Sequence, residues 1–299
     1  MVMKFSISLA TDRIDCGSEF VGGAAISEIA RASENSGYDA CFVTDHPFPV
    51  QRWLDGGGHH ALDPFVALTV AAAATRTIRL HTHIVVLPYR NPFLLAKAAL
   101  TLDLVSEGRL ILGAAAGYLR GEFQALGADF ETRNEASDEA LVALKRAWTE
   151  NNDRMTGRAF EARGNTMLPR PIQEPHPPIW IGGNSKQAIL RAVEHADGWV
   201  PFPNSAAMAP FTRTPVLETD EQLSSRIGFA LEQSSTLGRT RPLVICYSLD
   251  TSPTGDPGLL RERIAVLEGL GVEWLTVGFP ARTRAGYISE LEEFARHLA

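Results

Sequence analysis

The chain has 299 residues, 45% of them hydrophobic and 21% charged, which is ordinary for a globular protein that can bury a large core. The formal net charge is -7 and no run of lysines and arginines occurs, which argues against nucleic acid or an anionic membrane surface as the main partner. No stretch approaches the ~18 apolar residues of a membrane span, and three well-separated cysteines indicate reduced thiols in a cytoplasmic protein.

Strand-like and helix-like patterns alternate along the chain. We expect strands at residues 4–10, 39–44, 78–87, 109–114, 178–182, 198–201, 243–249 and 272–278. Helical patterns lie between them, at 22–36, 63–75, 92–106, 120–127 with 135–150, 185–196, 218–236, 257–269 and 286–298. Such alternation implies parallel strands joined by right-handed crossovers. Eight units in this length favour one α/β domain over residues 1–299, a (β/α)8 TIM barrel, rather than an open sheet with a GxGxxG loop.

Two irregular segments interrupt this alternation. Residues 151–177 are rich in Asn, Gly, Arg and Pro, and residues 201–217 contain several prolines and little periodicity. We interpret both as insertions at the C-terminal face of the barrel, where the chemistry of such barrels is located. The Gly-His run at 56–60 is expected to be a loop rather than a cluster of ligands.

Two neighbouring strands end in groups that could carry chemistry. Asp45 and His46 follow the second strand, where they could hydrogen-bond a heterocycle or move a proton near neutral pH, although a simple turn is the alternative. His81 and His83 point to the same side of the third strand and could hold a metal together with Asp45 and His46. No later strand ends in a clear ligand, so a packed or cofactor-facing histidine is the preferred interpretation.

Small residues follow the next two strands. The segment 113–117 would let a flat ring approach the backbone, with Tyr118 lining that ring. Gly182 and Gly183, followed by Asn184 and Ser185 at a helix start, offer backbone amides beside a positive dipole end, which suits phosphate. Lys186 would add charge, and the alternative is a helix cap alone.

Four sequence pieces carry a resemblance to a known family. They are TDHP after the second strand, LPYRNPFLLAKAALTLDLVSEGRLILG, EFQALG, and PHPPIWIGGNSKQAILRAVEHADGW. In this order and spacing they resemble the luciferase-like flavin monooxygenase superfamily, most closely its branch of probable oxidoreductases that use the 8-hydroxy-5-deazaflavin coenzyme F-420. The likeness runs from about residue 25 to residue 203, and the C-terminal third matches only in architecture.

The resemblance implies roles for particular residues. Asp45 and His46 would lie at the coenzyme ring, with His46 as the catalytic residue near the redox carbon. A strand bulge, often with a non-proline cis peptide, would support the ring from behind. The remaining implied coenzyme contacts are Thr82, His83 and Ile84 in that bulge, Gly117, Tyr118 and Glu122 beside the coenzyme tail, and Gly182, Gly183, Asn184 and Ser185 at the phosphate.

The chain also departs from the family pattern. His83 stands where a small residue is usual, and Ala115 and Tyr118 stand where Gly and Trp are usual. The first hypothesis is hydride transfer between F-420 and a small organic substrate, and the second is an FMN-dependent monooxygenase. A third hypothesis is a metal-dependent barrel hydrolase, and a fourth is a non-catalytic coenzyme-binding protein. The resemblance also implies a homodimer, and Arg90, Arg120 and Lys186 are candidates to bind an anionic coenzyme tail.

Overall fold

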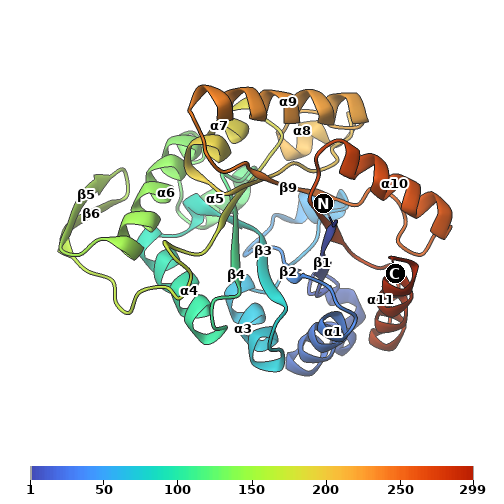
Figure 1. The fold of residues 1–299 in the computed structure, drawn as a ribbon. Helices are drawn as coiled ribbons and strands as arrows, with labels where there is room; N and C mark the ends of the chain where they lie inside the picture. The colour runs from blue at the N-terminus through green and yellow to red at the C-terminus, as the bar shows by residue number, and fades with distance from the viewer. Residues whose placement is uncertain (1, 299) are drawn as a thin grey trace.

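The computed structural model describes residues 2–298, which form a closed barrel of parallel strands. Around the barrel the strands follow the order β1-β10-β9-β8-β7-β4-β3-β2. Figure 1 shows the helices arranged around these strands. The (β/α)8 fold expected from the alternation of patterns is therefore confirmed.

The eight predicted strands and their helices are all present, with bounds that differ by a few residues. The barrel strands are β1 Lys4–Ser8, β2 Ala40–Val43, β3 Arg79–Val86, β4 Leu110–Ala115, β7 Ile179–Gly182, β8 Gly198–Val200, β9 Val244–Ser248 and β10 Trp274–Val277. The main helices are α1 Gly23–Asn35, α3 Pro64–Ala74, α4 Pro92–Val105, α5 Arg120–Ala125, α6 Arg133–Thr149, α7 Lys186–His195, α9 Asp220–Thr236, α10 Pro257–Gly269 and α11 Arg284–Leu298. None of the helices within residues 2–298 is long and apolar enough to span a bilayer.

Several short elements are not apparent from the sequence pattern. Two short helices, α2 Gln51–Asp55 and α8 Ala209–Thr212, lie in the loops after β2 and β8. Two 3-10 turns cover Ile14–Glu19 and Leu87–Tyr89. An antiparallel hairpin of β5 Asp153–Gly157 and β6 Phe160–Asn165 interrupts the alternation between α6 and β7.

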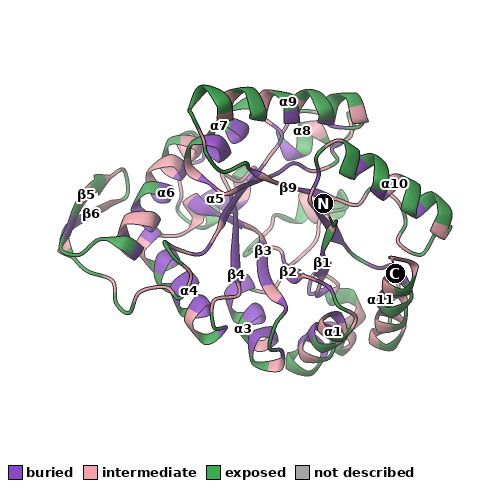
Figure 2. Ribbon diagram, in the orientation of Figure 1, coloured by how far each residue is buried: buried purple, intermediate pink, exposed green. Residues whose placement is uncertain are grey.

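The core is built from the apolar residues of the barrel strands and from one face of each surrounding helix. Inside the barrel, Ile111, Trp180 and Trp274 are buried against one another, while α3 and α4 turn small alanine faces toward the strands. Figure 2 shows buried residues along the strands and exposed ones on the outer helix surfaces. The proline-led helices begin as expected, because Asp63 and Asn91 accept backbone N–H groups at the starts of α3 and α4.

The position expected for residues 151–177 is wrong. The β5–β6 hairpin lies on the outside beside α6 (Figure 1), where the Arg158 amide donates to Glu139. Farther on, Gln173 donates from its side chain to Leu110 O at the start of β4. The segment joins a helix to the amino end of the next strand, so it must return to the opposite end of the barrel from the C-terminal face. Residues 201–217 follow the carboxyl end of β8 and do lie at the C-terminal face.

Candidate active site

His46 and Glu122 meet at the C-terminal face of the barrel, which we call the mouth. His46 follows β2 and Glu122 lies in α5 after β4, and their side chains approach with 3.4 Å between Nδ1 and Oε2. Glu122 is fully buried, and its carboxylate also accepts the Phe48 N–H at 3.0 Å and the Tyr89 hydroxyl at 2.9 Å. Burial and the Glu122 charge raise the pKa of Tyr89, so its hydroxyl keeps the proton that it donates. This buried carboxylate orients the imidazole through Nδ1 and leaves Nε2 for a ligand.

Aromatic rings surround the His46 imidazole. Its centroid lies 4.5 Å from the Trp53 ring, 4.8 Å from the His59 ring and 6.1 Å from the Tyr118 ring. Trp53 comes from α2, His59 from the glycine-rich loop after α2, and Tyr118 from the segment after β4. A Cβ on Gly58 would lie 2.3 Å from the indole, so the loop needs glycine there for Trp53 to pack against it. We call His46, Trp53, His59 and Tyr118 the aromatic cluster.

The floor of the mouth is built from the bulge in β3. The register with β4 shifts between Thr82 and Val85, and the His83–Ile84 peptide is cis, as the resemblance implies. Ile84 reaches across to β7, because a Cβ on Gly182 would lie 2.3 Å from its Cδ1. His83 has a buried Nδ1 with no hydrogen-bond partner among residues 2–298, and burial lowers its pKa to about 4. The floor therefore carries a neutral imidazole with an unused nitrogen.

Close backbone approach shapes the wall beside this floor. At Gly113 an added Cβ would lie 2.1 Å from Thr82 O and 3.0 Å from His81 Nε2, so only glycine fits there. Gly117 has a φ of 78°, and an added Cβ there would lie 2.5 Å from Val86 Cγ1. Both glycines lie at the end of β4, where a flat ring would need a smooth backbone surface.

Some residues implied by the resemblance are engaged within the protein. Asp45 is buried and accepts both terminal nitrogens of Arg90, at 2.5 and 2.9 Å, together with the Val86 N–H. Thr82 is buried and donates its hydroxyl to Gly113 O. These side chains hold neighbouring strand ends together. Any contact that they make with a coenzyme ring would come in addition to this structural role.

The turn before α7 presents amides, as the glycine pair predicts. Ser185 caps α7 by accepting the Ala188 N–H at 3.1 Å, and Gly183 has a φ of 122°. The Asn184 side chain is used elsewhere, because it donates to Phe202 O and accepts the Phe202 N–H. The amides that begin α7 and the Ser185 hydroxyl are thus the groups left for an anion.

The basic residues expected along an anionic tail point elsewhere. Arg90 is bound to Asp45, and Arg120 pairs with Glu131 at 2.5 Å. The Lys186 ammonium lies 5.6 Å from the Phe229 ring centroid, on the α9 side of its helix. An acidic side chain or an aromatic ring of another element contacts each of the three in this structure, and their binding of an anionic tail stays a prediction.

The two histidines of β3 lack partners that would complete a metal site. His81 is buried with its Nδ1 3.3 Å from the Ser6 hydroxyl and its ring 4.9 Å from that of Trp180. Burial lowers the pKa of His81 well below its usual value. Across residues 2–298, no group of three or more His, Cys, Asp or Glu side chains is arranged to hold a metal ion. His81 is a packed histidine of the barrel interior.

Sequence reasoning missed three members of the mouth. His59 was expected to lie in a loop rather than in a cluster of ligands, and neither Trp53 nor Tyr89 has an expected role of its own. The signal for His59 and Trp53 is their place directly after a strand that ends in His46, since loops after barrel strands converge at one end. Tyr89 has no local signal, because its partner Glu122 lies 33 residues away.

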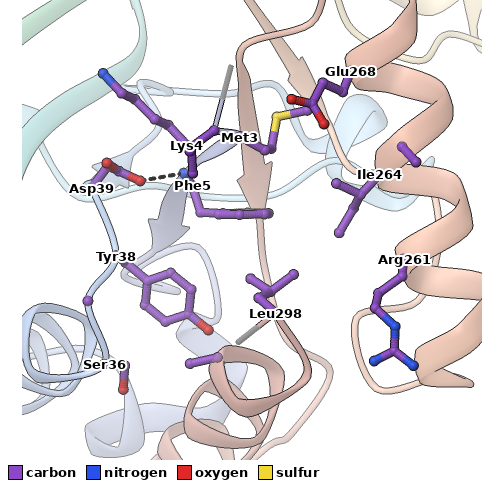
Figure 3. A pocket seen from close by; sticks show the side chains of 14 residues that line it. Met3, Lys4, Phe5, Ser36, Tyr38, Asp39, Arg261, Ile264, Glu268 and Leu298 are labelled. Atoms are coloured by element: carbon purple, nitrogen blue, oxygen red, sulfur yellow. Dashed lines mark hydrogen bonds between the residues drawn. The ribbon is translucent and has the colours of Figure 1, made fainter.

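A separate hollow of about 680 Å³ lies at the opposite end of the barrel, between β1, α1, α10 and α11. Figure 3 shows Tyr38, Ile264 and Leu298 along it. Two of its polar groups are engaged within the protein, since Asp39 accepts the Phe5 N–H and Tyr38 donates to Leu291 O. This end of a barrel serves stability, so the mouth is the candidate active site.

Comparison with known proteins identifies the family of this chain. The family described as luciferase-like monooxygenase matches residues 3–213. An uncharacterized protein of Mycobacterium tuberculosis, Rv0953c, is 26% identical over 93% of this chain and 95% of its own. The FMNH(2)-dependent dimethylsulfone monooxygenase of Pseudomonas putida is 30% identical over 60% of this chain and 48% of its own.

A solved structure extends the likeness to the whole fold. An F420-dependent secondary alcohol dehydrogenase, in complex with an F420-acetone adduct, superposes with a TM-score of 0.77 and 15% identity over 100% of both chains. At that identity the likeness concerns the barrel alone. The family match over residues 3–213, which is more than half of the chain, shows that this protein belongs to the luciferase-like monooxygenase family, as an oxidoreductase of that family.

Proposed function

We propose that this chain transfers a hydride between the deazaflavin coenzyme F-420 and a small organic substrate in the mouth of the barrel. The observation that carries the proposal is the His46 imidazole, which Glu122 orients through Nδ1 above the β3 bulge. Family membership supports a redox enzyme, and the F420-dependent dehydrogenase of the same fold supports this choice of coenzyme.

The residues of the mouth fit a planar ring with a phosphate. The unpartnered Nδ1 of His83 is a buried polar group that a ligand would satisfy. Gly113 and Gly117 let β4 and the segment after it pack closely on Thr82 and Val86 beside the bulge. The start of α7 would hold the phosphate through its amides and the Ser185 hydroxyl.

A deazaflavin supplies hydride transfer at its C5 carbon when bound, and the protein supplies placement and proton handling. His46 holds or releases a proton at Nε2, while Glu122 fixes the imidazole orientation through Nδ1. Trp53 and Tyr118 cover the imidazole and exclude water from it. Ile84, at the bulge and against Gly182, would support the ring.

An FMN-dependent monooxygenase is the second candidate. The named relative from Pseudomonas putida uses FMNH(2), and this chain spans about half of that protein's length. The phosphate turn suits either coenzyme, because both carry a phosphate. The side chains Arg90, Arg120 and Lys186 do not favour the longer anionic tail, since each is engaged elsewhere.

Titration of the purified protein with F-420 and with FMN distinguishes the candidates. Micromolar binding of the deazaflavin, with weaker FMN binding and no oxygen consumption in the presence of substrate, is the expected result. Tight FMN binding with substrate-dependent oxygen consumption would replace the first candidate with the second. Binding of either coenzyme without turnover of any substrate in a panel would identify a coenzyme-binding protein.

A further inference from the structure

Two histidines share the covered part of the mouth. His59 reaches the aromatic cluster from the glycine-rich loop after α2, and its ring lies 4.8 Å from that of His46 at an angle of 85°. The Trp53 ring packs against both imidazoles, at 4.5 Å from His46 and 5.4 Å from His59. His59 is thus held beside the proposed catalytic residue by a packed ring rather than placed freely on the surface.

The same nitrogen of each ring is tied to the protein. His59 Nδ1 lies 2.9 Å from His60 O, and because a carbonyl can only accept, Nδ1 must carry the hydrogen. His46 Nδ1 faces the Glu122 carboxylate, which favours the same tautomer. Neither Nε2 has a hydrogen-bond partner in the described chain, so each ring offers Nε2 as its free nitrogen.

The surroundings of His59 favour its neutral form. Burial lowers its pKa, the hydrogen bond to His60 O raises it, and the charge of His46 lowers it further. Asp12 raises the pKa of His59 and His60 lowers it, both by charge. A neutral His59 with its hydrogen on Nδ1 leaves Nε2 as an acceptor for a substrate hydroxyl.

We propose that His59 is a second substrate-binding residue, which together with His46 contacts an oxygen on the reacting end of the substrate. This inference rests on the proposed function and specifies its substrate class as compounds that carry a hydroxyl or carbonyl group. A hydroxyl donates to a neutral Nε2, and a carbonyl oxygen accepts from a protonated one. Trp53 and Tyr118 limit the space beside this oxygen and favour small apolar substituents.

Three variants test the role in turnover. His59→Phe keeps a ring against Trp53 and removes the nitrogen, His59→Gln keeps a polar group, and His60→Phe is the matched control. With the coenzyme that the titration identifies, His59→Phe should raise KM for alcohols or ketones about 3- to 10-fold, the loss of one hydrogen bond. The affinity for coenzyme should stay within about 2-fold and His59→Gln should recover part of the loss. A KM for His59→Phe equal to that of His60→Phe overturns the inference.

A measurement without coenzyme separates this inference from the proposed function. In protein labelled with 15N-histidine, acetone or 2-propanol should shift the Nε2 resonances of both His46 and His59 and leave His60 unchanged. Shifts confined to His46, or absent from both rings, overturn the role of His59. Failure to bind either coenzyme would instead refute the proposed function and leave the histidine shifts interpretable.

Discussion

Arg109 and Asp103 at the amino end of the barrel differ from His83 at the mouth in how their polar groups are hydrogen-bonded. At the amino ends of the strands, Arg109 donates to Ala72 O, Ile78 O and Ser106 O, among other acceptors. Asp103 is fully buried there and accepts hydrogen bonds from the amides of Ile172 and Gln173 and from the Gln173 side chain. At the mouth, by contrast, a buried nitrogen of His83 has no partner in residues 2–298.

Arg109 and Asp103 thus hold the fold together, whereas Nδ1 of His83 is open to a ligand. A buried polar group that is fully hydrogen-bonded stabilises the folded state, whereas an unsatisfied one costs about 1–3 kcal/mol unless something else binds it. Residues 166–177 pack at the amino end, and stability constrains them. The loops after β2 and β4 form the mouth, and ligand binding constrains them. Substitutions at the two ends should separate stability from turnover.

The largest effect is expected from His46→Ala. Removal of a general acid–base group should lower kcat by about 10²–10⁴-fold, while the affinity for coenzyme and the unfolding midpoint change little. Steady-state kinetics and coenzyme titration, with His60→Ala as the control, would measure this. Unchanged kcat would remove His46 from the mechanism. It would also contradict the idea that substitutions at the mouth affect turnover rather than stability.

At the opposite end, Asp103→Ala should affect stability instead. It leaves the amides of Ile172 and Gln173 without their buried acceptor, and we expect a loss of about 2–4 kcal/mol in the free energy of unfolding. Urea denaturation would measure it, and Asp103→Asn, which keeps one acceptor oxygen, should lose less. If the folded Asp103→Ala protein showed altered KM or kcat at low temperature, the amino end would also serve the active site.

Ser185→Ala should have a smaller effect on the phosphate turn. Loss of the hydroxyl should weaken binding of a phosphate-bearing coenzyme about 3- to 10-fold, since one hydrogen bond is removed. Loss of the cap to Ala188 should also lower stability by about 1 kcal/mol. Isothermal titration with FMN and with riboflavin, which lacks the phosphate, supplies the control. An equal loss for both ligands would place the phosphate away from α7.

The smallest expected effect is a pH-dependent change in stability at the amino end of the barrel, where Glu34 lies. Burial raises the pKa of Glu34, but hydrogen bonds from the amides of Thr77, Ile78 and Arg76 outweigh it and lower the pKa to about 2. Because the folded pKa is below the usual 4.5, the stabilisation is complete above about pH 4.5 and is lost as the pH falls toward 2. After allowance for solvent screening, we expect about 1 kcal/mol.

Glu34→Gln should therefore be less stable than the parent protein near pH 6 and equal to it near pH 2. Denaturant melts at several pH values would follow the difference in unfolding free energy. A difference that stays constant over this range would show that hydrogen bonding alone, and not the charge of Glu34, stabilises the connection to β3. Turnover at neutral pH should be the same for both proteins.

Local patterns in the sequence account for most of the barrel and for part of the mouth. The eight barrel strands, the proline-led helices at Asp63 and Asn91, and the capped start of α7 at Ser185 depend on neighbouring residues, so spacing alone predicts them. The bulge at His83 and Ile84 was implied by resemblance and is confirmed in position. The hairpin at 153–165 has no comparable pattern, because it is short, polar and exposed.

Chain order and side-chain chemistry were sufficient to place His46 and Ser185 at the carboxyl ends of parallel strands. They did not predict the contact of His46 with Glu122, which is 76 residues away, or the ion pair of Asp45 with Arg90. They also did not predict that His59 lies beside His46, or that residues 166–177 lie at the amino end of the barrel. Such pairings arise only when eight strands close on themselves, because closure brings together loops whose separation along the chain carries no information about their distance in space.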